Sequence, residues 1–122
     1  MLFILGQNAA LAGESTLEER AYREIAQFLK VGLTIVRDQR ELSAKIEQVV
    51  PIGTIKAESF QKLREFLAAP PSSIRLDWEL ERNPGGVTVV FVDGNHGFSI
   101  VIVLRFDPDG RVARVSTGEF VY

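Results

Sequence analysis

Apolar residues follow two different periods along this chain, and the change of period divides it into a helical part and a strand part. Up to about residue 69 they recur every three or four positions, the spacing of one face of an α-helix. From Ile74 onward they alternate with polar residues, the spacing of a strand with one buried face. The pattern predicts N-terminal helices followed by a sheet.

Three helices are expected in the first part. The first starts at two overlapping capping boxes, in which Ser15 and Thr16 each precede a glutamate by three residues, and it is amphipathic as far as Lys30. The second and third cover residues 41–50 and 57–69, and a proline follows each of them.

The segment Val31–Val36 fits two structures. Its β-branched residues and Gly32 weaken the preference for a helix and would suit a strand. We favour a continuation of the first helix, and the choice between helix and strand stays open at this point.

Four strands are expected in the second part, separated by short turns rich in Gly, Pro, Asn and Asp. They cover residues 74–81, 87–92, 98–106 and 111–122. Parallel neighbours would need crossovers of a dozen residues or more, so these strands must form an antiparallel meander. The expected fold class is α+β: an N-terminal arm (residues 1–14), then one domain (residues 15–122) with helices packed on one face of a four-stranded antiparallel meander.

The two middle strands carry apolar residues on both faces, which one layer of helices cannot cover. The face shared with Trp78 is expected to pack against the helices. The opposite face is expected to hold four valines framed by polar residues, namely Val90, Val92, Val101 and Val103. An apolar patch of a few hundred Å² marks an interaction surface, so we expect a homodimer or a protein partner there. The alternative is that the N-terminal arm or Val31–Val36 covers this face within one chain.

Composition excludes several classes of function. The 122 residues include 14 Lys and Arg against 16 Asp and Glu, and a net charge of -2 gives no reason to expect binding to nucleic acid. With no Cys and one His, the chain cannot form disulfides or a zinc site of Cys or several His, and we expect no metal and no cofactor. The first apolar run is too short for a membrane span and lacks the basic start of a signal peptide, so we expect a cytoplasmic protein.

The second half of the chain resembles the NTF2-like superfamily, which includes ketosteroid isomerase and the SnoaL-like polyketide cyclases. The resemblance covers Phe60–Tyr122, a helix followed by strands and by the turn within Leu104–Val112. The first helix, with Arg20-Ala21-Tyr22, is similar to the family's opening helix, in which a tyrosine often faces the pocket. The resemblance implies a cone-shaped NTF2-like or cystatin-like fold and a dimer formed through the exposed sheet face.

The chain departs from this family where catalysis is concerned. Isomerase-type members carry an acidic residue on a hairpin between the second and third helices, and that residue can act as a base. Between Pro51 and Ala57 this chain has neither an acid nor room for a hairpin. The family's catalytic pattern therefore does not transfer, and we expect no catalytic residue by this route.

Three aromatic residues are the candidates for a ligand pocket. A cone between helices and sheet would be lined by aromatic groups with a polar tip, and Tyr22, Trp78 and Phe91 fit that description for a small apolar ligand. Large aromatic residues at core spacing also serve simply as core.

Two further candidates have a simpler explanation. His96 lies among glycines and is expected to be an ordinary turn histidine. Asp77 and Glu79 share one face of the first strand and could bind a cation, but we favour a solvated strand face paired with Arg105.

We therefore expect a non-catalytic binding or assembly module that self-associates through its sheet face. One alternative is a small lyase or isomerase with an apolar ligand cavity and Tyr22 as proton donor. The other is a partner-neutralising protein of the immunity type, which would bind a second polypeptide.

Overall fold

The computed structural model describes residues 18–93 and 96–121. The N-terminal arm and the capping residues Ser15 and Thr16 lie outside the described residues.

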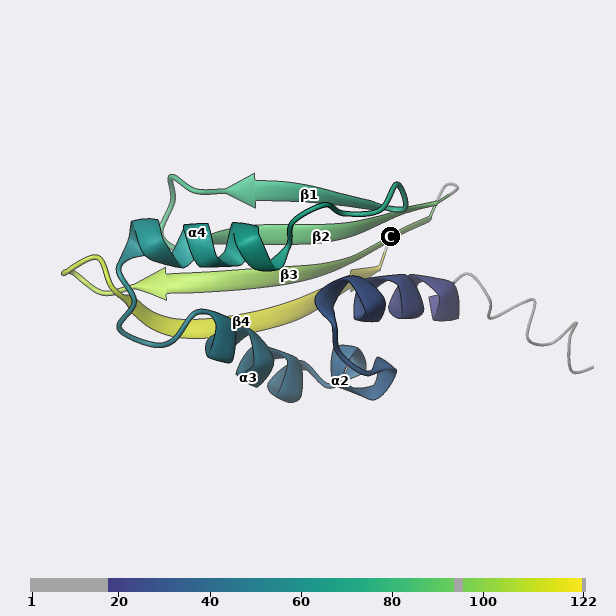
Figure 1. The fold of residues 1–122 in the computed structure, drawn as a ribbon, viewed down its shortest axis with the longest axis horizontal. Helices are drawn as coiled ribbons and strands as arrows, with labels where there is room; N and C mark the ends of the chain where they lie inside the picture. Colours follow the sequence, from purple (N-terminus) through teal and green to yellow (C-terminus); the bar gives the residue numbers. More distant parts are fainter. Residues whose placement is uncertain (1–17, 94–95, 122) are drawn as a thin grey trace, which may run out of the picture.

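Four helices precede the sheet in the described part of the chain (Figure 1). The first is described over residues 18–29, and α2 (Leu33–Arg37), α3 (Gln39–Val49) and α4 (Lys56–Phe66) follow it. The predicted helices over 41–50 and 57–69 correspond to α3 and α4, although α4 ends three residues earlier than expected. None of the described helices is long and apolar enough to cross a membrane.

The first helix does not continue through Val36, so the expectation of three helices is wrong. Lys30 adopts a left-handed conformation with φ 59°. Its N–H donates to the carbonyl of Gln27, and the N–H of Val31 donates to the carbonyl of Ala26. These two bonds form a Schellman motif, which ends a helix. The chain then restarts as α2, so the strand alternative for Val31–Val36 is wrong as well.

Asp38 alone joins α2 to α3. Its side chain accepts hydrogen bonds from the backbone N–H groups of Arg40 and Glu41, as an N-cap residue does. Its own N–H donates to carbonyl oxygens at the end of α2. One residue therefore ends one helix and starts the next.

The sheet is the antiparallel meander predicted from the turns. It consists of β1 (Ile74–Glu79), β2 (Gly85–Asp93), β3 (His96–Phe106) and β4 (Val112–Val121), in the spatial order β1-β2-β3-β4. Two predicted turn segments belong in part to strands, because β2 already includes Gly85 and β3 begins at His96, which pairs with Asp93. His96 is therefore a strand residue rather than the turn residue we expected.

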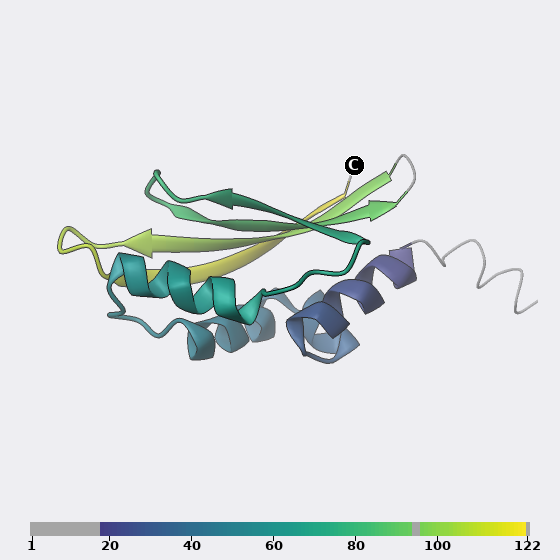
Figure 2. The same ribbon diagram turned by 45° about the horizontal axis from the view of Figure 1, so that its top comes forward.

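The helices all lie on one side of the sheet, as Figure 2 shows. Side chains on that side form the core, and the fully buried ones from β2 and β3 are Val89, Phe91, Ile100, Ile102 and Leu104. The helices contribute buried residues such as Ile25, Leu42 and Leu63 to the same cluster. Because these side chains have essentially no surface accessible to water, no water-sized space adjoins them.

Candidate functional site

The face of the sheet turned away from the helices, here called the outer sheet face, is defined by the strand register. Register partners on the four strands form rows across this face. One row consists of Asp77, Thr88, Val101 and Gly118, and the next consists of Glu79, Gly86, Val103 and Ser116. The flanking rows contain Arg75, Val90, Ser99 and Phe120 on one side, and Arg105 with Arg114 on the other. Val92 extends the face beyond the row of Val90.

All four valines selected from the sequence lie on the outer sheet face, but they differ in exposure. Val90 is buried, Val101 and Val103 are half-buried, and Val92 is 45% exposed. Phe120, which the sequence analysis did not select, is 56% exposed on the same face. The alternation of the last strand would have identified Phe120, because residues two apart along a strand lie on the same face and Phe120 is two residues from Gly118. The contribution of these residues to an interface stays a prediction.

Glycines make a shallow hollow in this face. A hollow of about 190 Å³ is lined by Asp77 and Glu79 of β1 and, farther across, by Gly86, Val101 and Val103. Gly86 has φ +151°, and a Cβ built at this position would collide with the carbonyl oxygen of Ile102. Only glycine fits there, so the hollow is a consequence of how β2 crosses β3.

Charged side chains lie at opposite edges of the outer sheet face. The carboxylate of Asp77 pairs with the guanidinium of Arg75 at 3.1 Å, so the expected pairing with Arg105 is wrong. Arg105 instead pairs in register with Arg114. Within residues 18–93 and 96–121, neither of these two guanidiniums forms a hydrogen bond or an ion pair, and neither does the exposed carboxylate of Glu79. The face thus has an acidic edge at β1 and a basic edge at β3 and β4.

A second polar cluster surrounds Tyr22 on the helix side of the sheet. Its hydroxyl donates to Glu119 Oε1 at 2.6 Å, and its ring meets Phe98 edge-on with 4.6 Å between the ring centroids. The Arg37 guanidinium lies 4.4 Å from the centre of the Tyr22 ring. Tyr22 and Arg37 border a depression of about 280 Å³ that Glu18 and Glu19 also line.

Burial and the neighbouring carboxylates raise the pKa of Tyr22. Burial is the largest cause, the hydrogen bond and negative charge of Glu119 follow, and Glu18 adds to them, whereas Arg37 opposes the shift. Each of the first three favours the neutral phenol over the phenolate. Tyr22 is therefore a weaker acid than a free tyrosine. Sequence reasoning missed Glu119, because 97 positions separate it from Tyr22 and no local pattern joins them.

The three aromatic pocket candidates do not all lie at the same end of the sheet. Tyr22 contacts Phe98, and Phe98 pairs in register with Phe91. Tyr22 and Phe91 therefore lie at the same end of the sheet. Trp78 pairs with Val87, four residues along β2 from Phe91, and the Arg64 guanidinium lies 5.7 Å from the centre of its ring. Four residues of strand span about 13 Å. A pocket shared by all three stays a prediction.

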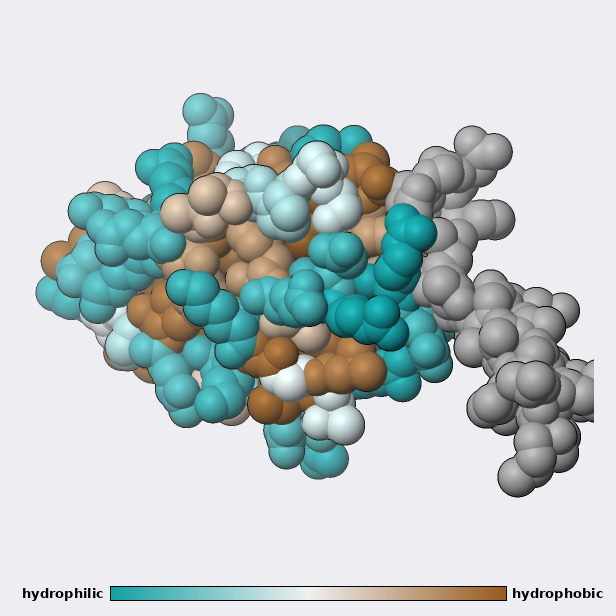
Figure 3. All heavy atoms as spheres, turned by 45° about the vertical axis from the view of Figure 1, so that its right-hand side comes forward, coloured by the Kyte–Doolittle hydropathy of each residue, from teal (hydrophilic) through white to brown (hydrophobic). Residues whose placement is uncertain are grey.

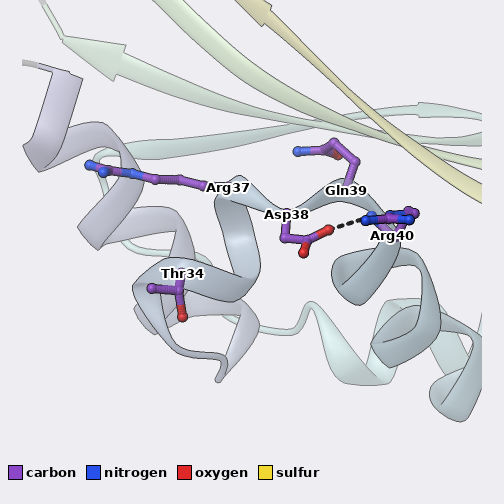
Figure 4. Close-up of a pocket in the computed structure, with 5 residues that line it drawn as sticks. All are labelled: Thr34, Arg37, Asp38, Gln39 and Arg40. Atoms are coloured by element: carbon purple, nitrogen blue, oxygen red, sulfur yellow. Dashed lines mark hydrogen bonds between the residues drawn. The ribbon is translucent and has the colours of Figure 1, made fainter.

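An open depression of about 550 Å³ lies at the junction of α2 and α3. Figure 4 shows that Arg37 reaches toward the N-terminal helix and away from Arg40, and that Asp38 accepts the backbone N–H of Arg40. The two guanidiniums therefore do not converge on a common anion position. The side-chain oxygen of Gln39 is buried here without a hydrogen-bond partner.

Neither metal chemistry nor similarity to known proteins points to a function. In the described ranges there is no group of three or more His, Cys, Asp or Glu residues placed to hold a metal ion. Comparison of the chain with protein-family models, with curated proteins and with solved structures finds no match. The NTF2-like resemblance stays a prediction.

Proposed function

We propose that this protein is a non-catalytic binding or assembly module that self-associates through its outer sheet face. The observation that carries the proposal is the exposure of two large apolar side chains, Val92 and Phe120, on the side of the sheet that no described helix covers. Half-buried Val101 and Val103 lie between them and the basic edge. A sheet with apolar residues on both faces needs cover on both.

The size of the face suits a moderately stable dimer. Strands of 6 to 11 residues, spaced about 4.8 Å apart and rising about 3.3 Å per residue, present roughly 600 Å² per copy. Two copies would bury roughly 1,200 Å², the lower end of the range for specific interfaces.

The surface on the helix side is organised differently. Figure 3, which brings one end of the molecule forward, shows several apolar areas with hydrophilic side chains between them. Among the described residues of the helical part, the large exposed apolar side chains are Leu33 at the start of α2 and Ile52 and Ile55 between α3 and α4. Scattered apolar residues of this kind are normal on a protein surface.

Lysine substitutions on the outer sheet face test the proposal. Val101→Lys combined with Val103→Lys places charges in the apolar centre, and Val92→Lys combined with Phe120→Lys changes only exposed positions. We expect both variants to be monomeric by light scattering while the wild type is a dimer. Leu33→Lys with Ile52→Lys is the matched control and should remain dimeric. A wild-type mass of one chain at all concentrations, or a folded Val92/Phe120 variant that stays dimeric, overturns the proposal.

The lyase or isomerase alternative depends on the Tyr22 cluster. The depression beside the Tyr22–Glu119 pair is the observation in its favour. However, the Tyr22 hydroxyl already donates to Glu119, and its raised pKa makes it a poor proton donor. A partner-neutralising role would use the outer sheet face as well, and co-purification of a second, basic polypeptide in place of a homodimer would favour it.

A further inference from the structure

Two arginines face each other on the outer sheet face, and no described residue supplies a counter-charge to them. Arg105 and Arg114 are register partners on β3 and β4, and both are exposed. Like charges directly opposite each other in a sheet are destabilising. No ion pair in the described part of the chain relieves them. The pair therefore forms a positive site aimed away from the core.

The same face carries a carboxylate in the complementary position. Glu79 lies on β1, at the opposite edge, and its carboxylate has no ion-pair partner among the described residues. Asp77 and the exposed Glu81 lie on either side of it along the chain. The three strand spacings between β1 and β4 amount to about 14 Å, so the acidic and basic edges of one copy cannot meet each other.

A second copy can bring the two edges together. A two-fold axis that lies between two facing sheets and runs along their strands places β1 of each copy over β4 of the other. Glu79 and Ser116 belong to the same row, and Arg114 is one row farther along β4. One row is about 7 Å, a distance that a long arginine side chain spans.

The same arrangement matches shape as well as charge. It places β2 over β3, so that Val103 of each copy lies above Gly86 of the other, because these residues share a row. Gly86 contributes to the hollow of about 190 Å³. A valine side chain facing a glycine in this way fills a space that would otherwise be left between the sheets.

We infer that the acidic edge of one copy, centred on Glu79, binds the Arg105–Arg114 pair of a second copy, and that these two symmetric contacts set the orientation of the dimer. This inference rests on the proposed self-association and adds its partner and its geometry. Opposite charges at both edges steer two copies together and exclude arrangements that would bring like charges into contact.

Charge reversal in two separate variants tests the inference. Glu79→Arg gives a dimer with two like-charge contacts, and so does the variant that combines Arg105→Glu with Arg114→Glu. We expect each variant alone to dissociate at least about tenfold more readily than the wild type. In an equimolar mixture of the two, the heterodimer contains two opposite-charge contacts, so mixing should restore wild-type affinity in sedimentation equilibrium. Lys45→Glu and Glu47→Arg on α3 are matched controls and should change nothing.

The outcomes separate this inference from the proposed function. If the single variants dimerise as tightly as the wild type, or if mixing restores nothing, the charge pairing is wrong while self-association stands. If wild-type protein is monomeric, both are wrong. Circular dichroism of each variant shows whether it is folded, and recovery on mixing cannot come from two misfolded chains.

Discussion

At the scale of single residues, Gly86 shows how backbone geometry constrains this sheet. Its φ of +151° disfavours any side chain, and a Cβ would collide with the carbonyl oxygen of Ile102 on the neighbouring strand. We expect Gly86→Ala to lower the free energy of unfolding by about 2 kcal/mol or more, measured by urea denaturation. Gly118→Ala is the control, since a Cβ there meets no atom within 4 Å. Equal stability of the two variants would contradict the expectation.

The Tyr22 hydroxyl is affected both by burial and by the neighbouring charge of Glu119. Tyr22→Phe removes the hydroxyl that donates to Glu119 but keeps the ring contact with Phe98. We expect a loss of about 1–2 kcal/mol in the free energy of unfolding at neutral pH. A loss near zero would mean that water replaces the hydroxyl at no cost.

The raised pKa of Tyr22 also predicts a pH dependence. Folding favours the neutral phenol, so its contribution to stability is complete below the pKa of an unfolded tyrosine, about 10, and is lost as the pH rises above it. The stability difference between wild type and Tyr22→Phe should therefore shrink as the pH rises above about 10. Urea denaturation of both proteins across this range measures it, and a constant difference would contradict the expected sign.

At the scale of elements, Lys30 decides where the first helix ends. The Schellman motif requires a left-handed residue there, a conformation that glycine adopts without strain. We expect Lys30→Gly to raise the free energy of unfolding by about 1 kcal/mol, whereas Lys30→Ala should give no such gain. Denaturation curves of both variants check this, and a destabilised glycine variant would show that the lysine side chain matters more than its backbone.

Most of the elements were predictable because their periods reflect burial. The short turns predicted the meander. The alternation from Ile74 onward predicted which side chains face the helices, since a strand in a two-layer fold must turn every second residue inward. The break at Lys30 was not predictable in the same way. A lysine in a left-handed conformation leaves no compositional signal, and β-branched residues follow it whether the chain continues or restarts.

At the scale of the whole molecule, self-association links stability to concentration. A dimer that forms only from folded chains is stabilised by mass action, so its melting temperature rises with protein concentration. We expect this rise for the wild type and its absence for Val92→Lys with Phe120→Lys, with calorimetry as the measurement. A melting temperature that is independent of concentration in both proteins would contradict self-association.

The sequence by itself determined the order of helices and strands, the antiparallel meander and the side of the sheet on which each valine lies. These features follow from local period and from turn lengths too short for any other connection. Tertiary structure alone decided that Tyr22 meets Glu119, that Asp77 pairs with Arg75 instead of Arg105, and that Arg105 faces Arg114. Such contacts depend on strand register, on side-chain conformation and on how helices are placed over the sheet, none of which a local pattern of apolar residues contains.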